Sequence, residues 1–242
     1  MSAPVSYLLC EGYLDRAFLA GWLEHLGCTA AKGVRDPYGD IVSGGRFAFW
    51  TPGRHFIVVQ PVEGESMLDT AAEELLRVQP TRPMRRLVVV RDADADAPGG
   101  ESVARDRSAG QVERAGRFLE TLGVERARLP AVESFCWWCE DPPDTPGVPP
   151  KQTLERLLCG ALSEQGADRG RSVSEWLAAP PAGDGPTHKN VAMAWFAKFT
   201  DAESQDWFYR GIWGVEPLRQ PLRRRLERSG AWEVVHRLVE GA

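Results

Sequence analysis

The stretch Leu87-Val-Val-Val-Arg-Asp92-Ala-Asp94-Ala-Asp96 joins a run of apolar, mostly β-branched residues directly to a group of carboxylates. An apolar run without polar alternation is typical of a buried strand in a parallel sheet. Open α/β sheets bind their ligands at the carboxyl ends of the strands, where Asp92 and Asp94 would lie. Residues two apart in an extended segment point the same way, so we expect both carboxylates to converge on one cation. Mg²⁺ would relieve the repulsion between them.

The composition is that of an ordinary globular protein, with 43% apolar and 26% charged residues in a chain of 242. No apolar run approaches the ~18 residues that span a bilayer, and the N-terminus lacks the features of a signal peptide. The chain has five cysteines, an odd and sparse set that does not indicate a disulfide framework. We therefore expect a cytoplasmic protein without membrane contact.

The net charge of −5 argues against a protein that holds nucleic acid by bulk charge alone. It does not exclude a nuclease, because a carboxylate metal site is acidic and its bound cations reverse the local sign of the charge.

The expected elements follow the order strand, helix, strands, helix, strand, helix, strand, which favours a mostly parallel α/β sheet flanked by helices. The expected strands are 5–10, 28–34, 46–50, 55–62, 87–91 and one within 124–135, and the expected helices are 14–26, 66–79 and 106–122. Beyond a loop at 140–150, helices are expected at 151–164, 172–178, 187–199 and, in pieces, 215–239, with a linker-like break at 180–186. We therefore divide the chain into an α/β domain, 1–140, and a helical C-terminal section, 141–242, packed on it.

A second acidic position ends the first expected strand, where Glu11 is followed by Gly12 and, in the first helical turn, by Asp15. Gly12 has no Cβ to obstruct the close approach of backbone or phosphate. A carboxylate at a strand end and another in the next helical turn can reach the same space. Asp15 is equally well explained by a favourable interaction with the helix dipole.

The two acidic strand ends together resemble the TOPRIM fold of topoisomerases, primases and OLD-type nucleases. The matching segments are Leu8-Leu-Cys-Glu11-Gly12-Tyr-Leu-Asp15 and Val88-Val-Val-Arg-Asp92-Ala-Asp94, and the resemblance covers residues 5–135. OLD-type TOPRIM domains carry a later Glu on a helix and then a Lys, and Glu155 and Lys189 fit those places. The chain is also similar to small stand-alone TOPRIM-like proteins of bacteria and archaea, whose activity is mostly undefined.

This resemblance implies a nuclease that cleaves nucleic-acid phosphodiesters, DNA rather than RNA, with Mg²⁺ or Mn²⁺. Two such ions, ~3.5–4 Å apart, would neutralise the phosphoryl and leaving oxygens. The implied metal ligands are Glu11, Asp92 and Asp94 at the centre, with Asp15 and Glu155 completing or supporting a second site. Lys189 would stabilise charge on the phosphate or leaving group. In another assignment Glu11 acts as the general base.

Other interpretations remain open. Asp92 and Asp94 can belong to a solvated acidic loop, Glu155 to the solvated face of a helix, and Lys189 to the surface. The protein can also be a non-catalytic metal-binding TOPRIM module with a regulatory role, acting through a protein partner that supplies ATPase activity or specificity. The acidic charge and the absence of a Gly-rich phosphate loop favour this alternative. A haloacid dehalogenase-type phosphatase also opens its site with Asp-x-Asp, but normally near the N-terminus, and it leaves Glu11 without a role.

Three further features have structural interpretations. Cys136-Trp-Trp-Cys139 has metal-ligand spacing but no second Cys or His pair, so a buried structural pair is favoured. The basic segment Arg219–Arg228 is expected to be a solvated helix face, with nucleic-acid backbone contact as the alternative. The tryptophans, five of which lie beyond residue 170, are expected to fill a core.

Overall fold

The structure is a computed structural model that describes residues 5–31, 33–125, 128–179, 187–197 and 205–241, so the expected break at 180–186 lies outside the described residues. The strands are β1 (Val5–Cys10), β2 (Thr29–Ala30), β3 (Phe47–Trp50), β4 (Phe56–Pro61), β5 (Arg86–Asp92) and β6 (Ala131–Trp137). The helices of the α/β part are α1 (Tyr13–His25), α2 (Glu65–Arg77) and α3 (Gly100–Thr121). The later helices are α4 (Leu154–Gln165), α5 (Ala167–Ala178), α6 (His188–Phe196), α7 (Gln205–Gly211), the 3₁₀ turn η2 (Ile212–Gly214), α8 (Glu216–Arg228) and α9 (Ala231–Glu240).

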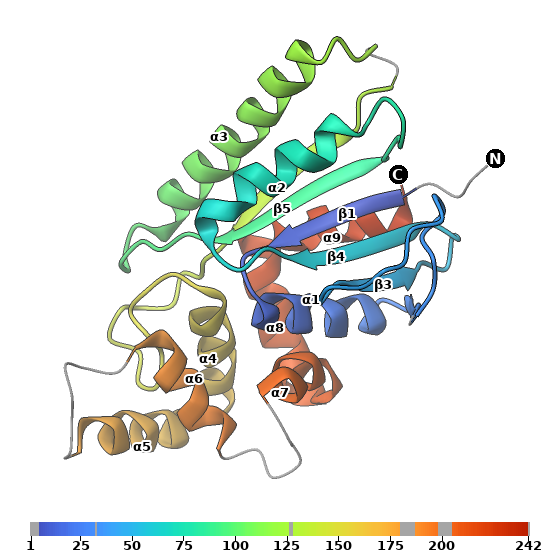
Figure 1. The fold of residues 1–242 in the computed structure, drawn as a ribbon. Coiled ribbons are helices and arrows are strands. Elements are labelled where there is room, and N and C mark those ends of the chain that lie inside the picture. Colours follow the sequence, from blue (N-terminus) through green and yellow to red (C-terminus); the bar gives the residue numbers. More distant parts are fainter. Residues whose placement is uncertain (1–4, 32, 126–127, 180–186, 198–204, 242) are drawn as a thin grey trace.

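The strands form one six-stranded sheet in the order β2-β3-β4-β1-β5-β6 (Figure 1). β1 pairs in parallel with both β4 and β5, and β5 pairs in parallel with β6. The expected strands 46–50 and 55–62 form an antiparallel hairpin, β3–β4, and β2 extends it. The expected α/β fold with a mostly parallel sheet is therefore confirmed. Because β1 and β5 are neighbours and parallel, their carboxyl ends lie side by side at the same edge of the sheet.

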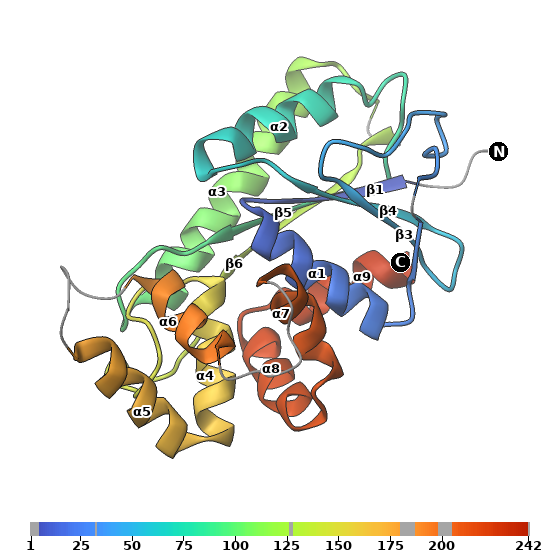
Figure 2. The same ribbon diagram turned by 60° about the horizontal axis from the view of Figure 1, so that its bottom comes forward.

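Alternate residues of the central strands face two different cores, as the pleat requires. Leu9, Leu87 and Val89 pack against α2 and α3. Leu8, Val88 and Val90 face the larger core, which includes side chains of α1, α4, α8 and α9. Figure 2 shows α2 and α3 on one side of the sheet and α1 with α9 on the other. The strands are apolar on both faces because both faces are covered.

The C-terminal helices share the larger core with the sheet. Trp22 of α1 stacks on Trp213 at 5.3 Å between ring centroids, and the indole N–H of Trp213 donates to the Phe18 carbonyl at 3.2 Å. A Cβ on Gly21 would lie 2.2 Å from the Arg210 carbonyl oxygen, so α7 approaches α1 at a position that only glycine permits. Within the described residues, no helix is long and apolar enough to cross a membrane.

Several expected boundaries are corrected. α3 begins at Gly100 rather than at 106, and β6 continues to Trp137 rather than ending by 135. α7 was not expected at all, because its seven residues are too few to show a helical apolar pattern in the sequence. Met67 and Val112, whose helical spacing places them with the apolar residues of α2 and α3, are nevertheless 48% and 38% exposed. Of the five late tryptophans, Trp195 and Trp213 are buried but Trp176 and Trp207 are exposed.

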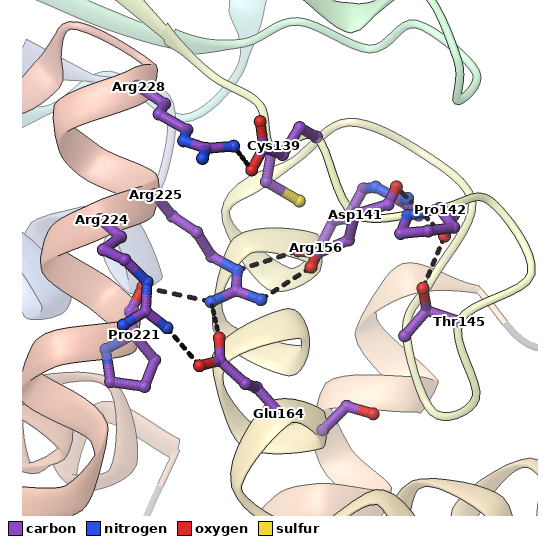
Figure 3. Close-up of polar contacts among 12 residues, drawn as sticks. Cys139, Asp141, Pro142, Thr145, Arg156, Glu164, Pro221, Arg224, Arg225 and Arg228 are labelled. Carbon is purple, nitrogen blue, oxygen red and sulfur yellow. Dashed lines mark hydrogen bonds and ion pairs between the residues drawn. The ribbon is translucent and has the colours of Figure 1, made fainter.

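Three arginines of the basic segment of α8 form polar contacts with other parts of the molecule, as Figure 3 shows. Arg225, only 10% exposed, donates to both carboxylate oxygens of Asp141, at 2.9 and 2.7 Å, and to Glu164 of α4 at 2.9 Å. Arg224 also pairs with Glu164, and Arg228 pairs with Glu140. These ion pairs attach α8 to α4 and to the loop after β6, which favours a structural role over backbone contact with nucleic acid.

This arrangement predicts a strong dependence of stability on Arg225. Arg225→Ala leaves Asp141 mostly buried without its partner, and we expect the free energy of unfolding in urea to fall by about 2–3 kcal/mol. Burial alone would raise the pKa of Asp141, but Arg225 outweighs it and the pKa lies below its ordinary value. The difference between variant and wild type should therefore shrink as the pH falls through that lowered pKa.

The matched control is Arg171→Ala, which removes an exposed ion pair with Asp168 in α5. We expect the control to change the free energy of unfolding by less than about 0.5 kcal/mol. Equal losses in the two variants would contradict the structural role of Arg225.

Candidate functional site

Asp92 joins three segments of the chain at the carboxyl end of the sheet. It is the last residue of β5, and its backbone N–H donates to Oε1 of Glu11, just after β1, at 3.0 Å. Its own Oδ1 accepts the N–H of Leu154, the first residue of α4, at 3.0 Å. The N-terminus of α4 therefore points at a carboxylate, an arrangement that the helix dipole stabilises. Figure 1 shows α4, α5 and α6 beyond this edge of the sheet.

Asp15 lies in the same region, held from two sides. Trp137 of β6 donates its indole N–H to Oδ1 at 2.7 Å, and the N–H of Gly12 donates to Oδ2 at 3.1 Å. The second bond closes the first turn of α1, so Asp15 has the local capping role that its position allows. The bond from Trp137 is a long-range contact, and it turns the carboxylate toward the strand ends.

Glu155 completes the group from α4. It is only 5% exposed, which excludes the alternative of a solvated helix face, and its Oε1 accepts the hydroxyl of Tyr209 at 3.1 Å. Tyr209 belongs to α7, the helix that the sequence did not predict. The structure therefore brings together carboxylates from β1, α1, β5 and α4.

The close approach of these groups shifts their pKa values. Burial and the charges of Asp15, Glu155 and Glu11 hold the pKa of Asp92 well above its ordinary value. Burial, followed by the charges of Glu155 and Glu11, raises the pKa of Asp15 to about 7. Burial also raises the pKa of Glu11, with Asp94 and Glu65 adding to the effect. Within the described residues, no ion pair joins Glu11, Asp15, Asp92 or Glu155 to an arginine or lysine.

Asp94 departs from the expected geometry. β5 ends at Asp92, and Asp94 has a φ of 53°, so the rule that alternate residues of an extended segment point the same way does not apply to it. Its side chain is exposed and lies 3.9 Å from Arg107. In the described part of the chain, no group of three or more His, Cys, Asp or Glu side chains is arranged so that it could hold a metal ion.

Lys189 lies exposed in the first turn of α6, and among the described residues no hydrogen bond or ion pair joins it to the carboxylates. Cys136 and Cys139 are both free and buried. Burial is the largest cause of the raised pKa of each thiol, which is about 11 for Cys136 and about 12 for Cys139.

Two positioning residues escaped the sequence analysis. Arg107 of α3 donates to Oε1 of Glu65 at 2.7 Å and to the Asp92 carbonyl at 3.2 Å, so a cation lies beside the acidic strand end. Gln152 accepts the Asp94 N–H through its backbone carbonyl at 3.0 Å, while its side chain bonds to both backbone groups of Cys139. Neither residue has a sequence signal, because each acts through contacts with segments distant in the chain.

Comparison with known proteins supports the fold but not a function. No protein-family model matches the sequence, and no curated protein matches it. The chain is similar to the crystal structure of the hypothetical protein PH0156 from Pyrococcus horikoshii OT3, with 18% sequence identity and a TM-score of 0.66. The likeness covers 98% of this chain and 99% of that chain, so the α/β part and the C-terminal helices both belong to it. At this identity the likeness shows the fold alone.

The crowded carboxylates predict a pH dependence of stability. Between the ordinary aspartate pKa and about 7, the folded protein keeps a proton on Asp15 that the unfolded chain releases, so the free energy of unfolding falls as the pH rises through this window. Glu155→Gln removes a charge that raises the pKa of both Asp15 and Asp92, and glutamine can still accept the Tyr209 hydroxyl. We expect the variant to be more stable than wild type by about 1 kcal/mol above neutral pH, with a smaller difference in acid.

Urea denaturation at several pH values measures this difference. Glu120→Gln, on the exposed surface of α3, is the matched control and should leave the pH profile unchanged. A profile for Glu155→Gln identical to that of wild type would contradict the proximity of these carboxylates.

Proposed function

We propose that this protein is a phosphodiester hydrolase of the TOPRIM type that uses Mg²⁺ or Mn²⁺ and acts on nucleic acid, DNA rather than RNA. The observation that supports this proposal is the convergence of Glu11, Asp15, Asp92 and Glu155, from four separate elements, without a basic partner in the described residues. Buried carboxylates with raised pKa values in this arrangement are characteristic of functional sites. A divalent cation is the simplest group that would relieve their repulsion.

The donor set fits a hard cation in its chemistry. Glu11 and Asp92 each use one carboxylate oxygen in a hydrogen bond from a backbone N–H, which orients the group. Among the described residues, the second oxygen of each has no hydrogen-bond partner and is available as a ligand. Carboxylate oxygens are the ligands that Mg²⁺ and Mn²⁺ prefer. The side chains do not form a complete cage by themselves, so we expect binding to draw them closer together.

In this proposal Glu11, Asp92 and Asp94 hold the cation, and Asp15 and Glu155 support a second position. The bound cation would supply charge neutralisation at the phosphoryl and leaving oxygens. Trp137 and Tyr209 hold Asp15 and Glu155 in place through their hydrogen bonds.

A basic side chain must also meet the phosphate. Lys189 is the candidate from the sequence, and Arg107, 31% exposed and hydrogen-bonded to the Asp92 carbonyl, is the candidate from the structure. A guanidinium contacts phosphate oxygens through two donors at once, whereas an ammonium acts as a compact point charge.

One observation favours a second candidate, a non-catalytic metal-binding module that regulates a protein partner. Among the described residues, no group of side chains already has the arrangement of a metal site. This agrees with a site that binds a cation weakly or that does not catalyse hydrolysis. Such a module would still need Glu11 and Asp92 for cation binding but would show no hydrolysis by itself. Its partner would supply ATPase activity or specificity.

Cation binding is testable without any substrate. We expect millimolar MgCl₂ or MnCl₂ to raise the melting temperature of the protein, whereas KCl at equal ionic strength should not. At saturation the cation should raise the free energy of unfolding by about 1–3 kcal/mol. Asp92→Asn should remove the effect, because it deletes a central ligand. Asp96→Asn is the matched control, since Asp96 is exposed and pairs with Lys151 outside the cluster. Equal shifts in the two variants would contradict the proposed site.

Hydrolysis is tested on supercoiled, linear duplex and single-stranded DNA, and on RNA, with Mn²⁺. We expect wild type to cleave DNA and both Glu11→Gln and Asp92→Asn to lose activity on the order of 100-fold. Lys189→Ala and Arg107→Ala, compared side by side, identify the basic side chain that contacts the phosphate, because only that variant should lose rate while keeping the cation-dependent melting shift. Cation binding without cleavage of any substrate would support the non-catalytic module instead.

A further inference from the structure

One exposed ridge of α3 carries a charge pattern in which positions equidistant from its centre have opposite charges. Residues spaced by four along this helix are Glu101, Arg105, Ala109, Glu113 and Arg117. All four charged side chains are 62–73% exposed, and among the described residues they form ion pairs only within the helix, Glu101 with Arg105 and Glu113 with Arg117. Figure 1 shows α3 along the outer margin of the molecule, beyond α2 and the sheet. The 22-residue helix therefore presents one long face to solvent.

This pattern is self-complementary about Ala109. When a second copy of α3 lies antiparallel across a twofold axis at Ala109, each Arg105 meets the partner copy's residue 113, and each Glu101 meets its residue 117. Every such contact joins an acidic to a basic side chain. Ridges of residues spaced by four on two helices run alongside each other in the commonest class of helix packing, at a crossing angle of about −50°. The charges along the whole ridge can then match.

The centre of the ridge is shaped for close approach. Ala109 is small and exposed, and Gly116 has no atom within 4 Å of the position that a Cβ would occupy. Val112, on the same side of the helix, is 38% exposed although the sequence pattern places it in a core. A partner helix would bury this valine between flanking ion pairs, an apolar centre with a charged rim that is typical of protein interfaces.

A groove beside the ridge offers further contact surface. A cavity of about 700 Å³ lies between α3, the outer side of β6 and the turn that joins α8 to α9. Its wall on α3 includes Arg105, Ala109, Val112 and Glu113, and its opposite wall includes Gly230. β6 is the terminal strand of the sheet on this side. A second copy seated on α3 would cover the groove as well as the ridge.

We propose that α3 forms the interface of a twofold-symmetric homodimer, with Ala109 at the axis and Arg105 of each copy paired with Glu113 of the other. The interaction is isologous, because the same surface serves both copies. The pairs within each helix then become parts of two larger networks, one on either side of the axis. This inference is independent of the proposed hydrolase activity, and the carboxylates of the site take no part in it.

Sedimentation velocity at low salt tests the proposal on the full chain. We expect wild type to form dimers at micromolar concentrations, weakened by added NaCl because exposed ion pairs are screened. Arg105→Glu and Glu113→Arg each place like charges opposite one another twice across the axis, so each should raise the dissociation constant by about tenfold or more. An equimolar mixture of the two variants should associate again, because both pairs of the heterodimer then join opposite charges: the new Glu at 105 faces the new Arg at 113, and the unchanged Arg105 faces the unchanged Glu113.

Arg169→Glu is the matched control, a change of the same kind at an exposed position of α5, and it should dimerise as wild type does. Circular dichroism checks that each variant is folded, which is expected because the altered side chains are exposed. The proposal is overturned by a wild type that stays monomeric at all concentrations, by an Arg105→Glu variant that dimerises normally, or by two folded variants that fail to associate when mixed.

Discussion

The structure depends on the way in which one carboxylate, that of Asp92, is accommodated at the end of the central strand β5. Its backbone N–H donates to Glu11 and its side chain accepts the N–H of Leu154, each at 3.0 Å. A carboxylate withdrawn from water needs hydrogen bonds, and here the donor comes from the start of a helix more than sixty residues further along the chain. This bond attaches the C-terminal helices to the carboxyl edge of the sheet, so that Glu155 reaches the cluster.

The carboxylate cluster is unfavourable for stability in isolation. Asp92 and Asp15 both have raised pKa values because burial and neighbouring charges disfavour ionisation. Trp137 and Tyr209 each donate a hydrogen bond that keeps the side chains facing inward. A protein that retains such repulsion in an otherwise well-packed fold has a local conflict of the kind expected at functional sites.

The charged side chains of α8 and of α3 form different kinds of ion pair. On α8 the arginines form ion pairs with acidic residues of α4 and of the loop after β6, and Arg225 is nearly buried in this network. On α3 the charges of the outer ridge are exposed and, within the part of the chain that the structure describes, pair only inside their own helix. The basic segment that is most conspicuous in the sequence is therefore largely occupied, whereas the alternating charges of α3 remain available for an intermolecular contact.

The sequence by itself determined the order of strands and helices in the α/β part and the two acidic strand ends, because apolar runs and turn residues are local signals. It also indicated Glu155, on the motif resemblance alone. Only the tertiary structure decided that Glu155 is buried against Tyr209, that Asp94 turns out of the strand, and that Arg107 lies beside Asp92. These features depend on contacts between segments distant in the chain, which no local periodicity encodes.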